Sequence, residues 1–546
     1  MSHIDLENKT DALHMDDVAP ALAATTTGPD VDKRQPVLDS AFAHLGFFPS
    51  ARLFWRIVLI ATGVFMGAMF DGFSVTIPGS ISANSSFVQR FGTVIAADGT
   101  KALNAQYVGA WGGIQSGGQI IGMVTGGFTS DMFGRKFNML VLSLLLAIAI
   151  VLELTAQNWI YFLMGRLLAG WATGLVQSGL TSYVAEISPT ALRTGLLTIY
   201  SVWFGVGQFA AAIALQIVET HNLNWRSAFY SEIVFLGLFL PVAIFAPESP
   251  WYYANKGDHE GAKRALMRLN GRVAGYDVEH EYAVLESSVS HALALKQSAS
   301  ATSWLTVFKG VNGRRTWISF LPLATQQFLG IPLVFGNLAY FFSIAGIADP
   351  FLPSVASNAI LIGGLIVAAF TVDKFGRRFL LLTGESINLI CVLFMGVIGT
   401  LARQNGGELS STSSNAIVAL ACIWVAAYSM SAGPLGWAYV ADTATPVLRA
   451  KTTSFAAALT CCFGLIFNYT TPIMLSPQQA NWGIEIGYFF AGLSALGLVL
   501  IYFTVPETRR LSFAELDELF EAKVSARKFK STHAQLRRAE QAAGYV

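Results

Sequence analysis

Long apolar runs, each about as long as a membrane-spanning helix, alternate with short polar segments along the chain. A helix that crosses a bilayer needs about 20 mostly apolar residues, because it rises only about 1.5 Å per residue. The pattern therefore predicts an all-α membrane protein with twelve transmembrane helices. The predicted spans cover residues 55–78, 107–128, 138–155, 159–183, 195–218, 227–246, 316–344, 353–372, 379–402, 415–440, 452–474 and 483–505.

The polar segments divide the chain into five predicted units. Two six-helix halves cover residues 53–247 and 316–506. A polar linker at 248–315 joins them, and its amphipathic stretches predict short helices on the membrane surface. Residues 1–52 lack an apolar core, which predicts a disordered cytosolic arm and not a signal peptide. Residues 507–546 are expected to form a charged cytosolic tail that starts as an amphipathic helix.

The composition indicates a lipid environment. Hydrophobic residues make up 53% of the chain and charged residues only 13%, whereas a soluble domain carries about 25% charged residues. The formal net charge of +1 gives no reason to expect nucleic acid as a partner. The four cysteines lie inside apolar runs without a metal-binding spacing, and no nucleophile–base set is visible. No cofactor and no enzymatic activity are therefore expected.

Positive charge indicates the orientation of the chain. Arginines and lysines gather in every second loop, among them Arg135, Arg193, Arg377 and Arg449, and such loops face the cytosol in multi-pass membrane proteins. Both termini and the linker are therefore expected in the cytosol, with the chain in the plasma membrane. Asn84 begins an Asn-Ser-Ser sequon in the first outer loop, which makes it a candidate glycosylation site.

A charged motif occurs twice, as "TSDMFGRK" at 129–136 and as "TVDKFGRR" at 371–378. Two further features are duplicated in the same order. An acid precedes an arginine by seven residues at Glu186 and again at Asp442, and a Pro-Glu pair ends both the sixth and the twelfth span. The chain is therefore predicted to consist of two homologous six-helix halves. Repeats of this kind place a substrate site between the halves, near the middle of the bilayer.

The duplicated charges lie at cytosolic helix ends, where two interpretations remain open. They serve as topological anchors, or they form ion pairs that latch the two halves together when the site faces outward. Anchoring alone needs no acids at fixed spacing, which favours the latch. The predicted cytosolic gate comprises Asp131, Arg135, Lys136, Glu186, Arg193, Asp373, Arg377, Arg378, Asp442 and Arg449.

Asp71 and Arg166 are the ionisable residues that lie deepest in the predicted spans. Each lies roughly 10 Å from the outer end of its helix, so the two are expected to form a pair. A protonatable acid beside an arginine suits a proton-coupled carrier, because protonation frees the arginine and shifts the conformational balance. The alternative is a static structural ion pair.

Several motifs follow one another between about residues 60 and 520: "TSDMFGRK", "GRLLAGWATG", "YVAEISPTALRTG", "PESPWYY", "QQFLG", "TVDKFGRR", "GPLGWAYVADTATPVLRAK" and "PETRRLSFAELDELF". In this order they resemble the sugar porter family of the major facilitator superfamily. The C-terminal part is most similar to the fungal α-glucoside, or maltose-type, permeases. The resemblance implies the major facilitator fold with two pseudo-symmetric halves, a sugar-like substrate and a monomer.

The resemblance also raises a question about proton coupling. The family places its coupling acid in a Gly-aromatic-Asp motif of the first span, and Ser74 stands at that position here. Asp71 lies one turn earlier on the same helical face. Either Asp71 performs the coupling from a shifted position, or coupling is lost and the protein is a facilitator.

Three side chains are implied as substrate contacts by the resemblance. Gln326 and Gln327 carry amides that donate to and accept from neighbouring sugar hydroxyls, and Trp437 offers an aromatic face to the CH surface of a sugar ring. The alternative is that the amides bond neighbouring helices and that the tryptophan only packs. Two adjacent amides at membrane depth are costly unless they find partners.

The chain departs from the family at other substrate positions. Pro332 replaces an asparagine, Ser201 replaces a glutamine, and Thr460–Cys461 replace an amide–tryptophan pair. A wider and less polar pocket follows, which suits a disaccharide, a glycoside or a metabolite that is not a sugar. The further polar candidates in the spans are Gln115, Gln119, Gln177, Gln208 and Asn337. The six positions expected to contact the substrate are Gln326, Gln327, Trp437, Asn337, Ser201 and Thr460.

Together these features predict a secondary transporter that moves a sugar by alternating access with proton symport, the sugar being a disaccharide, an α-glucoside or a hexose. Two alternatives remain: an exporter of a fungal secondary metabolite on the same fold, and a nutrient sensor that binds without transport. The sensor would need a cytosolic interaction domain, and the predicted tail is short for that purpose.

Overall fold

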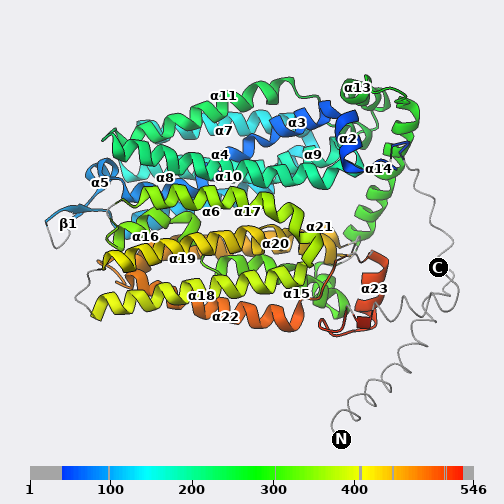
Figure 1. Ribbon diagram of the computed structural model, residues 1–546. Helices are drawn as coiled ribbons and strands as arrows, with labels where there is room; N and C mark the ends of the chain where they lie inside the picture. The colour runs from blue at the N-terminus through cyan, green and yellow to red at the C-terminus, as the bar shows by residue number, and fades with distance from the viewer. Residues whose placement is uncertain are drawn as a thin grey trace, which may run out of the picture.

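The computed structural model describes residues 40–532, apart from gaps at 43, 96–98, 302, 348, 405–408, 446–447, 510, 512 and 530. Twelve membrane-length helical segments in this described part run side by side in one bundle (Figure 1). The predicted all-α fold with twelve spans is therefore confirmed. Ten of the segments are both long enough and apolar enough to cross a membrane. The other two are α6, which is rich in glycine, and the broken α15–α16 segment.

The N-terminal half contains the first six spans. They are α3 (Trp55–Phe65) with α4 (Gly67–Ser80), α6 (Ala105–Phe133), α7 (Arg135–Thr155), α8 (Trp159–Leu175) with α9 (Thr181–Ile187), α10 (Thr190–Thr220) and α11 (Tyr230–Phe245). The C-terminal half contains the other six. They are α15 (Gly310–Phe328) with α16 (Leu338–Ile344), α17 (Phe351–Phe375), α18 (Arg377–Gln404), α19 (Ser411–Met430) with α20 (Ala432–Thr443), α21 (Arg449–Leu475) and α22 (Ile486–Thr504).

Shorter elements mark the two ends of the bundle (Figure 1). The linker end carries α2 (Phe47–Leu53), α12 (Pro250–Asn255), α13 (His259–Asn270), α14 (Val278–Ala301) and α23 (Phe513–Glu521). The hairpin end carries α5 (Ser85–Phe91) and the antiparallel pair β1 (Val94–Ile95) and β2 (Lys101–Ala102). Single turns complete the chain: η2 (Ile81–Ala83), η3 (Val176–Leu180), η4 (Trp225–Phe229), η5 (Trp304–Phe308), η6 (Pro332–Gly336) and η7 (Gly483–Glu485).

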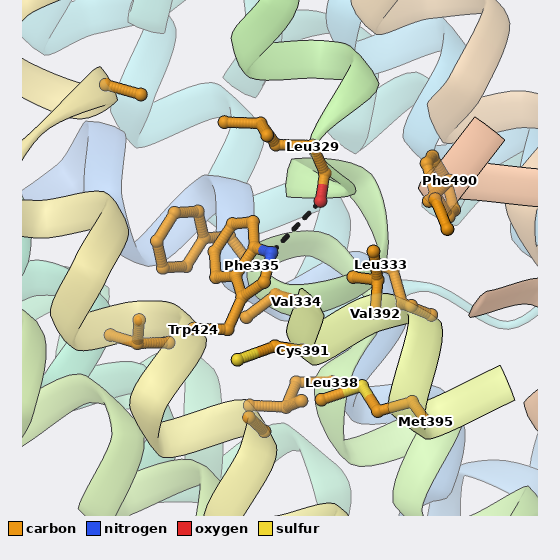
Figure 2. Packing of buried hydrophobic residues seen from close by; sticks show 14 of the residues in the cluster. Leu329, Leu333, Val334, Phe335, Leu338, Cys391, Val392, Met395, Trp424 and Phe490 are labelled. Atoms are coloured by element: carbon orange, nitrogen blue, oxygen red, sulfur yellow. Dashed lines mark hydrogen bonds between the residues drawn. The ribbon is translucent and has the colours of Figure 1, made fainter. Parts of the chain in front are cut away.

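The seventh span breaks between α15 and α16. Gly330 adopts a φ of +99°, which only glycine adopts freely, and Pro332 opens the wide π-type turn η6. The amide of Leu333 then bonds to the carbonyl of Gly330, which leaves the carbonyl of Leu329 without its helical donor. The indole Nε1 of Trp424 donates to that carbonyl at 3.1 Å (Figure 2). The break is thus held open by one buried side chain.

Apolar packing around this break forms the centre of the C-terminal half. Figure 2 shows Leu333, Val334 and Leu338 of the broken span against Val392 and Met395 of α18. All five side chains are buried. Because this cluster joins α18 and α19 to the broken span, the backbone irregularity lies inside protein, where a lipid-spanning chain tolerates it.

Backbone contact between α4 and α10 fixes the N-terminal half. A Cβ at Gly72 would lie 1.9 Å from the carbonyl oxygen of Phe204, and a Cβ at Gly207 would lie 1.9 Å from that of Met69. The two helices therefore approach as closely as their backbones allow, which is typical of small residues in membrane helix pairs.

The two halves also touch each other directly. At the hairpin end, a Cβ at Gly79 of α4 would lie 2.0 Å from the carbonyl oxygen of Gly336 in η6. Along the seam between α6 and α21, a Cβ at Gly109 would lie 2.3 Å from the carbonyl oxygen of Tyr469. The structure is therefore closed between α4 and η6 at the hairpin end.

The structure contradicts the predicted glycosylation of Asn84. This side chain is only 1% exposed. Its Oδ1 accepts from the amide of Phe87 at 3.1 Å and so caps α5, and its Nδ2 donates to Glu219 at 2.5 Å. The sequon hydroxyl of Ser86 also bonds to Oδ1. A glycan on Nδ2 would displace α5 from the bundle, so the sequon serves as a helix cap.

We expect Gly72→Ala to destabilise the fold by about 1–3 kcal/mol, because the added methyl group must push α4 and α10 apart. The measurement is the thermal unfolding midpoint of the purified protein in detergent. Gly237→Ala in α11 is the matched control, since no atom lies within 4 Å of a Cβ at that position. An unchanged midpoint for Gly72→Ala would contradict the close packing described above.

Candidate functional site

A small polar cavity lies on the seam between the two halves. Its volume is about 50 Å³, which is room for ordered water but not for a sugar ring. Both halves contribute to its wall through α4, α6, η6 and α21. The lining residues are Val75, Pro78, Gly79, Val108, Gly112, Gln115, Ser116, Gln119, Gly336, Asn337 and Asn468. We call this space the central cavity.

Arg166 of α8 holds one wall of the central cavity in place. Its Nη1 forms an ion pair with Oε1 of Glu153 at 2.8 Å. Its Nη2 donates to Oγ of Ser74 at 2.9 Å and to Oε1 of Gln115 at 2.7 Å. Both charged side chains are fully buried. Gln115 therefore belongs both to the cavity wall and to the arginine network.

The expected ion pair between Asp71 and Arg166 is wrong. Among the described residues, the only carboxylate within 4.0 Å of Arg166 belongs to Glu153. The physical reason is rotation about the α4 axis: Ser74 points at the guanidinium, whereas Asp71, one turn earlier, points towards α10 and η3. The alignment that set Ser74 at the family's acid position thus agrees with the geometry.

A second carboxyl group lies beside the arginine network. Glu232 of α11 is fully buried, and its carboxyl group lies within hydrogen-bonding reach of Glu153. Two carboxylates and one guanidinium would leave a net negative charge in a low-dielectric interior. One proton shared between the two glutamates would make the cluster with Arg166 neutral.

The sequence pattern alone does not single out these two glutamates. Glu153 lies three residues from the end of the predicted span 138–155, and Glu232 lies near the start of 227–246. A charged residue near a span end is ordinarily read as interfacial. One sequence feature could have indicated the pair of Glu153 and Arg166. Glu153 lies near the end of one span and Arg166 near the start of the next, so both lie towards the same end of the bundle.

Asp71 has a hydrogen-bonded environment of its own. Its Oδ2 accepts from the hydroxyl of Tyr200 at 2.5 Å and from Nε2 of Gln177 at 2.9 Å. Gln177 lies in the π-type turn η3, and its Oε1 accepts from Gln119 of the central cavity at 2.8 Å. No cationic side chain among the described residues lies within 4.0 Å of this fully buried carboxyl group. A chain of amides thus connects Asp71 to the cavity.

The glutamine pair of α15 lies apart from the central cavity. Nε2 of Gln326 donates to the carbonyl of Ala432 at 2.7 Å, and its Oε1 accepts from the hydroxyl of Tyr428 at 3.3 Å. Gln327 is partly buried and faces Gly464 of α21. In this conformation Gln326 therefore joins α15 to α20, which corresponds to the structural alternative for these amides.

The remaining substrate candidates are spread over several helices. Asn337 lines the central cavity, and its Nδ2 donates to the carbonyl of Pro332. Trp437 of α20 is 46% exposed. Ser201 and Thr460 are partly buried, and the hydroxyl of Thr460 bonds within its own helix. Of the six predicted substrate contacts, Asn337 lines the central cavity in this conformation, and the other five are not among its lining residues.

Asn468 is a cavity residue that is not among the predicted site residues. It begins an Asn-Tyr-Thr sequon at membrane depth, where no glycan can be attached. Its Nδ2 donates to the hydroxyl of Ser116 across the seam at 3.1 Å. An amide side chain inside a predicted apolar span is the sequence feature that could have indicated a site between the halves.

The predicted gate charges of the N-terminal half form a cluster at the linker end. Arg135 pairs with Glu186 at 2.8 Å and with Asp131 at 3.6 Å. Glu248 of the Pro-Glu motif accepts from the backbone amides of Arg135 and Lys136 at 2.9 and 3.0 Å. A carboxylate at this position caps the N-terminus of α7 and interacts favourably with its dipole.

The C-terminal half repeats this arrangement. Arg377 forms an ion pair with Asp442. Glu507 accepts from the backbone amides of Arg377 and Arg378 at 3.0 and 3.1 Å, and so caps α18. The repeated Pro-Glu motif therefore has a structural role that the sequence reading did not assign: it supplies the helix cap in each half.

The predicted latch between the halves stays a prediction. The ion pairs described above for Arg135 and Arg377 each stay within one half. Asp131 also pairs with Lys296 of α14 at 3.3 Å. The side chain of Asp373 lies outside the described part of the chain, while Arg193 and Arg449 lie partly buried at the starts of α10 and α21.

A family model described as "Sugar (and other) transporter" matches residues 59–520. The MFS transporter fmqE of Aspergillus fumigatus is 27% identical over 88% of this chain and 89% of that protein. The general alpha-glucoside permease of Saccharomyces cerevisiae is 26% identical over 89% of this chain and 77% of that protein. Among solved structures, the inward open conformation of the xylose transporter XylE from E. coli superposes with a TM-score of 0.68. Its sequence is 22% identical, and the match covers 85% of this chain and 99% of that chain.

We expect Glu153→Leu to destabilise the protein by about 3–5 kcal/mol, because it leaves the buried guanidinium of Arg166 without its ion-pair partner. Adding Arg166→Met should recover part of the loss, since the unpaired charge is then gone. The measurement is the thermal unfolding midpoint of the single and double variants.

Glu485→Leu is the matched control for this experiment. It removes the partner of the exposed Arg403, and surface ion pairs contribute only about 0–1 kcal/mol. Equal losses for Glu153→Leu and Glu485→Leu, or no recovery in the double variant, would contradict a stabilising buried pair.

Proposed function

The chain belongs to the sugar transporter family of the major facilitator superfamily, and we propose that it carries a sugar across the membrane by alternating access, coupled to protons. Members of this family are transporters and not enzymes. One observation supports the proposal above all: the central cavity between the halves is hydrogen-bonded to both buried acid sites, through Gln115 to Arg166 and through Gln119 and Gln177 to Asp71.

The proposed substrate is a disaccharide or an α-glucoside. Amides and one indole suit hydroxyl groups and the CH face of a pyranose ring, and Gln326, Gln327 and Trp437 supply them when the site is open. The small groups at Ser201 and Thr460 leave space beside them. The similarity to an alpha-glucoside permease supports this substrate class, and a sugar-like metabolite moved outward is the second candidate.

Asp71 is the proposed proton-binding residue. Arg166 already has Glu153 as its counter-ion, so it does not hold Asp71 ionised. A buried carboxylate with two neutral donors and no cation is easily neutralised by a proton. A proton on Asp71 weakens the hydrogen bonds from Tyr200 and Gln177, because a neutral carboxyl group is a poorer acceptor than a carboxylate. Gln177 and the bonded Gln119 are then held less firmly and can turn towards the substrate. Proton and substrate are coupled because each changes the partners available to the other.

The closed hairpin end supports one direction of access. With Gly79 against Gly336 at that end, we propose that the central site is reached from the linker side in this conformation. We propose that the linker end is cytosolic, because the arginine- and lysine-bearing loops lie there, and that the chain works as a monomer in the plasma membrane. A ligand drives the change of state only by its different affinity for the two states.

Reconstitution in proteoliposomes tests the transport function. We expect maltose uptake that rises when the interior is alkaline relative to the bath, since an inward proton gradient then drives the substrate. Radiolabelled maltose, glucose and xylose define the substrate class. Equilibration that ignores the gradient would indicate a facilitator, and the absence of any sugar uptake would contradict the proposal and favour the export of another metabolite.

Asp71→Asn should abolish accumulation against a gradient while sugar exchange persists, because asparagine keeps the bonds to Tyr200 and Gln177 but carries no titratable proton. Counterflow and gradient-driven uptake of the same sugar separate the two activities. Glu521→Gln in the exposed part of α23 is the control carboxyl variant. If Asp71→Asn still concentrates the sugar, Asp71 has no part in coupling.

A further inference from the structure

A fully buried acid lies in the C-terminal half, far along the sequence from the proposed coupling residues. Glu385 of α18 has no exposed surface, and its Oε1 accepts from the hydroxyl of Thr325 in α15 at 2.8 Å. Its Oε2 has no hydrogen-bond partner in the described part of the structure. Nothing in the mechanism above uses this carboxyl group.

Asn388 adds a second unsatisfied polar group on the same side of α18. It follows Glu385 by three residues, so the two side chains are neighbours on one helical face. Asn388 is also fully buried, and neither its Oδ1 nor its Nδ2 has a hydrogen-bond partner among the described residues. Buried unpaired amides are rare, because removing a donor and an acceptor from water without new partners costs free energy.

The charged groups of the neighbouring helices are engaged elsewhere. Arg315 of α15 pairs with Asp517, and Asp442 of α20 pairs with Arg377, both at the linker end. No cationic side chain of the described residues lies within 4.0 Å of Glu385.

The polar groups of these helices likewise have other partners. The hydroxyl of Tyr428 in α19 donates to Gln326, and that of Tyr439 in α20 donates to the carbonyl of Pro506. The hydroxyl of Ser494 in α22 donates to the carbonyl of Phe328. An ionised Glu385 would therefore have one neutral hydrogen bond and no counter-charge.

We propose that Glu385, together with Thr325 and Asn388, forms a second proton-binding site, in the C-terminal half. This site rests on the proposed proton-coupled transport and deepens it, because Glu385 of α18 is hydrogen-bonded to Thr325, which lies on the helix that carries the glutamine pair. A proton from water binds Oε2 of the ionised carboxyl group and gives a neutral acid. The same proton leaves from the same oxygen when water reaches the site in another conformation.

The proton controls how firmly α15 is held to α18. A hydrogen bond to a carboxylate is roughly twice as strong as a bond between neutral groups, so deprotonation tightens the contact from Thr325 and protonation loosens it. Protonated Oε2 becomes a donor, for which Oδ1 of Asn388 is the nearby acceptor. Gln326 follows Thr325 directly in the sequence, and Gly330 with η6 forms the break beyond it. The protonation state of Glu385 therefore affects the position of α15, the helix that carries Gln326 and Gln327.

Infrared difference spectroscopy on the full-length protein in lipid tests this site directly. We expect a C=O band of a protonated, dry carboxyl group in the wild type that weakens as the buffer is made alkaline. Glu385→Gln should remove this band, because glutamine keeps the acceptor for Thr325 but has no acidic proton. Glu521→Gln in α23 is the matched control: it removes an exposed carboxyl group and should leave the band in place.

Thr325→Val keeps the test decisive if Glu385→Gln does not fold. It removes the hydroxyl donor with little change of volume, so the band should remain and shift in frequency and in its pH midpoint. A wild-type spectrum from which Glu385→Gln subtracts nothing would overturn the proposal, as would a band that persists unchanged at every pH.

The transport assay separates this proposal from the proposed function. If the wild type moves sugar without proton dependence, the proposed proton coupling is wrong. The infrared band still shows independently whether Glu385 binds a proton. If the wild type is proton-coupled, Glu385→Gln should lower the number of protons carried with each sugar. An unchanged proton-to-sugar ratio together with an unchanged infrared band would leave Glu385 with no role as a proton site.

Discussion

A charged side chain inside a lipid-spanning bundle must find its counter-charge, its hydrogen bonds or a proton within the protein. This constraint organises the structure. Arg166 is neutralised by Glu153, and Glu232 lies next to that glutamate. Asp71 is held by neutral donors only. The Arg166 network and the Asp71 site therefore differ in which group can bind a proton, and both are hydrogen-bonded to side chains of the central cavity.

The repeated sequence motifs supply partners for charged side chains and for free backbone amides at the linker end of both halves. Glu248 and Glu507 each accept two backbone amides at the start of the third helix of their half. The adjacent arginines, Arg135 and Arg377, pair with acids of the neighbouring helix. The two halves are therefore built on one plan, while the interior polar residues differ, with Glu153 in one half and Glu385 in the other.

The sequence was sufficient for the fold, because the length and apolarity of the spans are local properties, and the repeat follows from motif order. The alignment that set Ser74 at the position of the family's coupling acid needs only one helix, and Ser74 does lie next to Arg166. The partner of Arg166 was not predictable in the same way. It depends on the rotation of α4 and α7 about their axes, which sequence depth does not reveal. For the same reason Gln326 was expected in the cavity, whereas here it bonds to α20.

The backbone contact between Gly79 and Gly336 has a consequence for the energy economy of a cell. With no side chain between them, α4 and η6 leave no room for water along this part of the seam. Protons hop only along connected water or polar groups, and backbone packed against backbone offers neither at this contact. Two residues without side chains thus limit proton leakage along this part of the seam.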